Sequence, residues 1–214
     1  SAPFDDWWHN AYGLDVMILS PPHMLLAAGF FGINFGTVML MLAFLNRAAD
    51  VARRRSAPSE LARGRVEGLQ RLFLYVGGMA VCESLLLKLE YISRSDMHSA
   101  SFYVIVAFGT VAIITAIGVA SGHRWGCTIL TAVYTAFGVA FLWIFPLFPA
   151  EPRLAPVLTP VTHFIPWEFP LLLMIPALVS DLILQRTPGW RPSVRGPAIG
   201  VAFFATFFAA QWLF

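Results

Sequence analysis

Aspartate and histidine side chains near the start of the chain have the types and spacing of a metal site. Asp5 and His9 are four residues apart, so in a helix they lie on one face with Cβ atoms about 6 Å apart and can hold one ion. Further along, Ser20 and Pro21 are typical of a helix start, which places His23 in the first helical turn. Imidazole nitrogens and carboxylate oxygens are ligands for copper, zinc and iron. The pattern therefore predicts a metal site formed by Asp5, His9 and His23.

Four further residues are candidates for additional ligands. Glu83 and Glu90 lie seven residues apart, on one face of a later apolar segment. A carboxylate within a membrane helix is costly, so Glu83 is expected to be a metal ligand, part of a proton path, or a structural hydrogen bond to a neighbouring helix. Asp96 and His98 follow in a loop, where they either complete the site or form an ordinary polar turn. His163, before another apolar run, is expected to be an interfacial anchor.

The elements that must position these residues are membrane helices. Hydrophobic residues make up 58% of the chain and charged residues 12%, against about 25% charged in soluble domains. Apolar runs of about 20 residues, long enough to cross a bilayer, recur along the sequence. These runs are continuous and do not alternate, so they predict helices rather than barrel strands. We expect an all-α polytopic transmembrane bundle in one domain (residues 22–214), preceded by an N-terminal interfacial helix within residues 1–21. The six expected spans are residues 22–46, 68–92, 100–121, 126–147, 165–185 and 197–214.

Basic residues predict the orientation of this bundle. Arginines cluster in an expected loop at residues 47–67 and recur at 122–125 and 186–196, which are alternate connections on one face. The positive-inside rule makes that face cytoplasmic. Four of the five histidines (His9, His23, His98 and His163) and most of the acids then face the periplasm of a bacterial inner membrane. Attraction to anionic lipid also explains the arginine run, so we expect a lipid bilayer and no nucleic acid as partner.

The N-terminal motif resembles that of the C subunit of the copper-containing particulate methane and ammonia monooxygenases. That family has Asp-x-x-x-His with Trp before the His, followed by a Thr-Pro-x-His that opens a transmembrane helix. The matching positions here are Asp5, Trp8, His9, Ser20, Pro21 and His23. In the family, the Asp and the two His bind a metal, normally copper, at a site implicated in oxygen chemistry. The family's Asn-x-x-x-His in the next helix has no counterpart at 68–92, and further helices follow here, so the resemblance is to a distant relative.

Three functions follow from these patterns. The resemblance implies a copper-binding, monooxygenase-like subunit that acts on a small apolar substrate, with zinc or iron as other metals that suit the ligands. The second is a non-catalytic accessory subunit of a larger membrane complex, for which Gly29, Gly32 and Gly36 offer helix-packing positions within the bundle or with partner subunits. The third, a metal-handling transporter, needs polar residues across the bundle. Glu83 is one such residue, whereas Asp181 is expected to pair with Arg124 or Arg186.

Enzyme classes with strong local signatures are excluded as leading hypotheses. The sequence has no phosphate-binding glycine loop, no Cys-x-x-Cys pair, no His-Glu-x-x-His and no serine nucleophile motif. Metal binding at the histidine-rich face is therefore the leading prediction.

Overall fold

The computed structural model describes residues 2–13, 20–54, 59–148 and 165–213. All regular secondary structure in these ranges is helical. The helices are α1 (Ala2–Tyr12), α2 (Pro21–Arg53), α3 (Glu60–Leu86), α4 (Leu89–Ser93), α5 (Ala100–Ala107), α6 (Thr110–Ala120), α7 (Gly126–Val139), α8 (Met174–Arg186) and α9 (Pro192–Trp212). Short turns η1 (Ala140–Ile144) and η2 (Phe145–Leu147) extend α7, and η3 (Leu171–Leu173) precedes α8. The expected all-α class is confirmed.

Within the described ranges, five helical segments are long and apolar enough to cross a membrane. They are Pro21–Arg53, Glu60–Leu86, Ala100–Ala120, Gly126–Leu147 and Pro192–Trp212. The sixth expected span, 165–185, is not confirmed. Pro166 and Pro170 interrupt the helix there, and α8 begins only at Met174. Its 13 residues rise about 20 Å, less than the roughly 30 Å of the hydrocarbon core.

The ends of the first two long helices also differ from the expected spans. The predicted loop at 47–67 is largely helical, because α2 continues to Arg53 and α3 begins at Glu60. Ser59 caps α3 by accepting a hydrogen bond from the Ala62 N–H at 3.3 Å. The expected spans ended where the apolar runs end. The helices continue further because Arg and Glu are good helix formers outside the membrane as well.

A break divides the third span into α5 and α6. Gly109 between them has a φ of 74°, a conformation that favours glycine. Lys88, in the turn between α3 and α4, donates to the Phe108 carbonyl and, at 2.8 Å, to the Thr110 hydroxyl. The helix of the predicted span 68–92 ends at Leu86. Lys88 donates hydrogen bonds to the break between α5 and α6, a contact that the sequence pattern does not predict.

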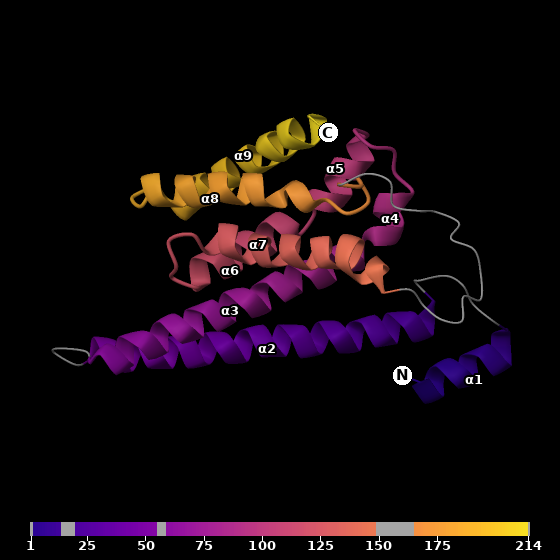
Figure 1. The fold of residues 1–214 in the computed structure, drawn as a ribbon, viewed down its shortest axis with the longest axis horizontal. Helices are drawn as coiled ribbons and strands as arrows, with labels where there is room; N and C mark the ends of the chain where they lie inside the picture. The colour runs from indigo at the N-terminus through magenta and orange to yellow at the C-terminus, as the bar shows by residue number, and fades with distance from the viewer. Residues whose placement is uncertain (1, 14–19, 55–58, 149–164, 214) are drawn as a thin grey trace.

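The long helices lie side by side and run in roughly the same direction or its reverse (Figure 1). Contacts join α2 to α3, α3 to α6 and α7, α7 to α8, and α8 to α9. The three connections were expected on one face, and the helix ends that flank them (the ends of α2, α6 and α8 and the starts of α3, α7 and α9) lie at one end, at the left of Figure 1. The α1 helix and the start of α2 lie at the opposite end.

Glycines allow the closest helix approaches in the core. A Cβ added to Gly78 in α3 would lie 2.6 Å from the Val133 Cβ in α7. One added to Gly118 in α6 would lie 2.4 Å from the Cys127 sulfur. Small residues at such crossings let backbones pack tightly, which gives van der Waals contact where lipid removes the hydrophobic driving force.

The α2 helix lies at the edge of the bundle and is mostly exposed. Its buried residues are Pro22, Val38 and Leu45. Gly29, Gly32 and Gly36 have open space where a Cβ would lie, so they mediate no close contact within the described part of the chain. Large apolar side chains of α2 are exposed as well: Met24, Leu25, Leu26, Phe30, Phe31, Ile33, Phe35, Met39, Leu40, Phe44 and Val51. This surface suits lipid contact.

Candidate metal site

The predicted Asp5–His9 pair forms on α1. The Nε2 atom of His9 lies 3.3 Å from Oδ1 of Asp5, one helical turn away. On the other side of the ring, Nδ1 lies 3.2 Å from the carbonyl oxygen of Gly13. A carbonyl only accepts, so Nδ1 carries a proton. An imidazole with that single proton has its lone pair on Nε2, on the side of Asp5.

Gly13 makes this orientation possible by ending α1. Its φ of 89° is the left-handed conformation typical of a glycine after a helix. Its N–H donates to the His9 carbonyl at 2.9 Å, so the same two residues are joined through both backbone and ring. Metal-binding histidines usually donate their second N–H to such a carbonyl or to a carboxylate, which fixes the tautomer.

The Asp5 carboxylate has an oxygen without a hydrogen bond. Oδ1 is buried and accepts no hydrogen bond, although it lies 3.3 Å from His9 Nε2. Two ligand atoms that each bind one tetrahedral ion at about 2.0–2.1 Å are separated by about 3.3 Å. The pair therefore has the spacing of two ligands around a shared metal ion or proton.

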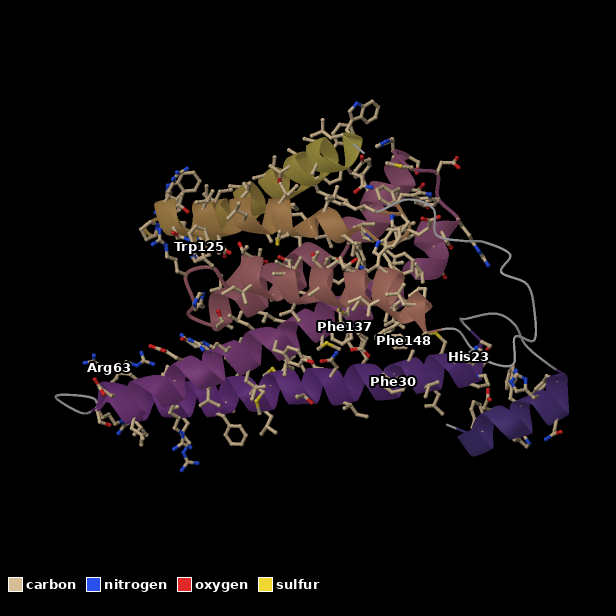
Figure 2. All side chains as sticks on the ribbon, viewed as in Figure 1. His23, Phe30, Arg63, Trp125, Phe137 and Phe148 are labelled. Carbon is tan, nitrogen blue, oxygen red and sulfur yellow. The ribbon has the colours of Figure 1, made fainter. Side chains whose placement is uncertain are left out.

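His23 lies in the first turn of α2, as its sequence context predicts. Its Nδ1 lies 3.0 Å from the hydroxyl of Ser20. Ser20 does not cap the helix through its side chain, because Pro21 and Pro22 lack the N–H groups of the first turn and the hydroxyl contacts the imidazole instead. Figure 2 shows His23 at the end of α2 that adjoins α1, and α1 and α2 are in contact.

The three predicted ligands do not converge on one point. Across the described residues, no group of three His, Cys, Asp or Glu side chains is arranged to hold a metal ion. The structure brings Asp5 to His9 and places His23 at the adjoining helix end. A complete three-ligand site stays a prediction.

Glu83 contacts a neighbouring helix. Its Oε2 accepts a hydrogen bond of 2.7 Å from Asn34 of α2, while Oε1 is buried without a hydrogen bond. Both side chains line a groove of about 980 Å³ between α2 and α3, which His23 and Phe30 also line. This bond matches one of the roles expected for Glu83, a structural hydrogen bond to a neighbouring helix. Asn34, a polar residue within an apolar run, is the signal that could have predicted it.

The other candidate ligands lie apart from this pair or outside the described part. His98 Nδ1 lies 3.0 Å from the hydroxyl of Tyr103, and its ring lies 4.6 Å from that of Trp212. Asp96 is exposed, and its carbonyl accepts the N–H of Ser99 in a turn. The His98 and Asp96 contacts are those of an ordinary aromatic and polar turn. The side chain of Glu90 and all of His163 lie outside the described residues.

Asp181 corrects another expectation. It pairs with neither Arg124 nor Arg186, but accepts hydrogen bonds at the start of α7. Its Oδ1 accepts from the Cys127 N–H at 3.1 Å, and its Oδ2 accepts from the N–H and hydroxyl of Thr128 at 2.8 and 2.7 Å. The first N–H groups of a helix have no partner within the helix and carry partial positive charge, so a buried carboxylate from α8 satisfies them.

Comparison of the chain with protein-family models, with curated proteins and with solved structures gives no match. The resemblance to the monooxygenase C subunit consequently depends on the N-terminal motif alone and stays a prediction.

Proposed function

We propose that this chain is an integral membrane metal-binding protein whose ion is held by Asp5 and His9, with His23 as a third ligand. The observation that carries the proposal is the Asp5 oxygen that accepts no hydrogen bond and lies 3.3 Å from His9 Nε2. The Gly13 carbonyl keeps the lone pair of Nε2 available by holding the proton on Nδ1. His23 is the nearest further imidazole in sequence, at the helix end that adjoins α1.

Copper is the metal we propose first, because the resemblance implies it and imidazole with carboxylate ligands suits it; zinc and iron accept the same ligands. A bound copper ion supplies redox chemistry with dioxygen, so a monooxygenase-like activity on a small apolar substrate is the reaction to assay. The same proposal places the site on the periplasmic side of a bacterial inner membrane and the arginine-rich end in the cytoplasm.

Metal analysis of purified variants tests the proposal. The chain is loaded separately with copper, zinc or iron, freed of excess metal, and analysed by mass spectrometry for bound metal per chain. We expect His9→Ala and Asp5→Ala to lose most of the metal and His23→Ala to bind it more weakly. His123→Ala is the matched control, because His123 lies in the turn between α6 and α7 and bonds the Trp125 N–H. Metal retained by His9→Ala at the wild-type level overturns the proposal, and unchanged affinity in His23→Ala removes His23 from the site.

A second candidate function is an accessory subunit of a larger membrane complex. The exposed α2 helix favours it, because Gly29, Gly32 and Gly36 leave room for a partner backbone that no described part of this chain occupies. We expect the chain to be extracted from its native membrane at a mass above that of one copy, and Gly32→Leu with Gly36→Leu to release it as a monomer. A monomer at the outset contradicts this function.

A further inference from the structure

A second groove lies between α2 and α3, at the end of these helices opposite to His23. It has a volume of about 410 Å³ and combines two arginines with apolar side chains. The α2 helix contributes Phe44, Arg47 and Val51, and α3 contributes Leu61, Arg65 and Leu69. Figure 2 shows this end of the helix pair, marked by Arg63.

The two arginines of the groove have no counter-charge in the part of the chain that the structure describes. Arg54 pairs with Asp50, but neither Arg47 nor Arg65 takes part in an ion pair or a side-chain hydrogen bond there. Both side chains are exposed, and no acidic residue lines the groove. A guanidinium group forms strong paired hydrogen bonds with phosphate, so the groove carries unsatisfied donors for an anion.

The apolar residues beside these arginines are exposed at what should be the edge of the membrane. Leu61 is 87% exposed, Val51 48% and Phe44 47%. The 33 residues of α2 rise about 50 Å, whereas the hydrocarbon core is about 30 Å thick. If the first turn of α2 lies at one interface, Phe44 lies near the opposite hydrocarbon edge and Arg47 at the level of the headgroups.

We propose that this groove is a binding site for an anionic phospholipid. Its phosphate lies between Arg47 and Arg65, and its acyl chains extend along Phe44 and Leu69, which lie about one turn nearer the hydrocarbon core. An inorganic phosphate or a soluble phosphorylated molecule does not use the apolar part of this lining, whereas a phospholipid uses both parts. Basic pockets between transmembrane helices on the cytoplasmic side are suited to such headgroups.

A titration of the full-length chain in detergent, followed by native mass spectrometry, tests the site. Phosphatidylglycerol, phosphatidylcholine and inorganic phosphate are added in separate arms, and phosphate is also added as a competitor. The groove variant is Arg47→Gln with Arg65→Gln. The matched control is Arg53→Gln with Arg63→Gln, which removes the same charge from the same helix ends but outside the groove.

We expect the wild-type chain to bind phosphatidylglycerol more tightly than phosphatidylcholine, and the groove variant to bind it about thirty-fold more weakly. The control should lose far less affinity. If both variants lose the same affinity for phosphatidylglycerol, the lipid binds by general electrostatic attraction to the helix ends, and the proposed site is overturned. If equimolar inorganic phosphate displaces the lipid, the apolar lining contributes nothing to binding. The arginines then form a phosphate site, and the lipid proposal is overturned. The wild-type comparison of the two lipids needs no variant, so equal binding of both lipids contradicts the proposal even if the groove variant does not fold.

Discussion

Two aspartates near helix ends, Asp181 and Asp5, have opposite environments. Asp181 is 2% exposed, and its two oxygens accept three hydrogen bonds at the start of α7. Asp5 lies on the peripheral helix α1, where its Oδ1 has no hydrogen bond and faces Nε2 of His9. Buried polar groups are normally hydrogen-bonded, so the bonds of Asp181 give it a structural role, whereas the Asp5 oxygen can still accept a partner. The contrast separates the anchor of the fold from the candidate site.

Glycines divide the molecule in the same way. Gly78 and Gly118 lie in the core, where an added Cβ would collide with α7, whereas Gly32 and Gly36 on α2 face open space. The core of the bundle is thus closely packed, while α1 and α2 form an edge with an exposed outer face. That edge carries the candidate metal site and both grooves beside α2.

The largest effect is expected for Asp181→Ala. It leaves the N–H groups of Cys127 and Thr128 without acceptors in a buried helix end, which should cost about 3–5 kcal/mol of unfolding free energy. Thermal unfolding in detergent measures the loss, and Asp181→Asn, which keeps one acceptor oxygen, should lose less. If the Asp181→Ala protein is as stable as wild type, Asp181 does not stabilise the fold and the contrast with Asp5 is lost.

Alanine at the core glycines should have the next largest effect. Gly78→Ala and Gly118→Ala overpack the contacts with α7 and should each destabilise the chain by about 1–3 kcal/mol. The matched variants Gly32→Ala and Gly36→Ala should change stability by less than about 0.5 kcal/mol, because their Cβ atoms enter open space. The same unfolding assay applies. A loss at Gly32 equal to that at Gly118 would show that α2 packs as closely as the core.

The bond between Asn34 and Glu83 should contribute less. Hydrogen bonds between membrane helices are worth about 0.6 kcal/mol on average. A double-mutant cycle of Asn34→Ala and Glu83→Ala should therefore give a coupling energy of this size. Metal content should stay at the wild-type level in both variants, since Glu83 is engaged with α2. Loss of metal from Glu83→Ala alone would restore Glu83 as a ligand.

Asp5→Ala should have the smallest effect on stability. Asp5 has no described partner except His9, so we expect a change below about 0.5 kcal/mol together with a loss of bound metal. Unfolding without metal and metal titration, performed on one preparation, separate the two quantities. A large loss of stability without any loss of metal would make Asp5 structural, like Asp181.

Local relations were predictable from the sequence, and relations between distant segments were not. The Asp5–His9 contact follows from helical spacing, and the apolar runs predict the membrane helices. The span at 165–185 was not confirmed, because Pro166 and Pro170 delay the start of α8 although a continuous apolar window covers them. Hydropathy counts apolar residues but does not record where the backbone breaks.

The partner of Asp181 could not be predicted for a different reason. Its partners are backbone N–H groups of α7, more than fifty residues away, and the N–H groups of a helix start have no signature in residue type. Arginines, by contrast, can be recognised in the sequence by their charge. The sequence therefore suggested Arg124 and Arg186 as the groups that donate to Asp181, whereas in the structure the start of α7 donates to it.

The central claim, that His9 and His23 bind one ion with Asp5, is tested most directly by pulsed electron paramagnetic resonance of the chain loaded with copper(II). The spectrum counts coordinated imidazoles through their nitrogen couplings. We expect two imidazoles in the wild-type chain, one in His9→Ala, one in His23→Ala, and two in His98→Ala, whose ring packs against Trp212. An imidazole count unchanged by His9→Ala, or a wild-type spectrum without imidazole coupling, would contradict the site.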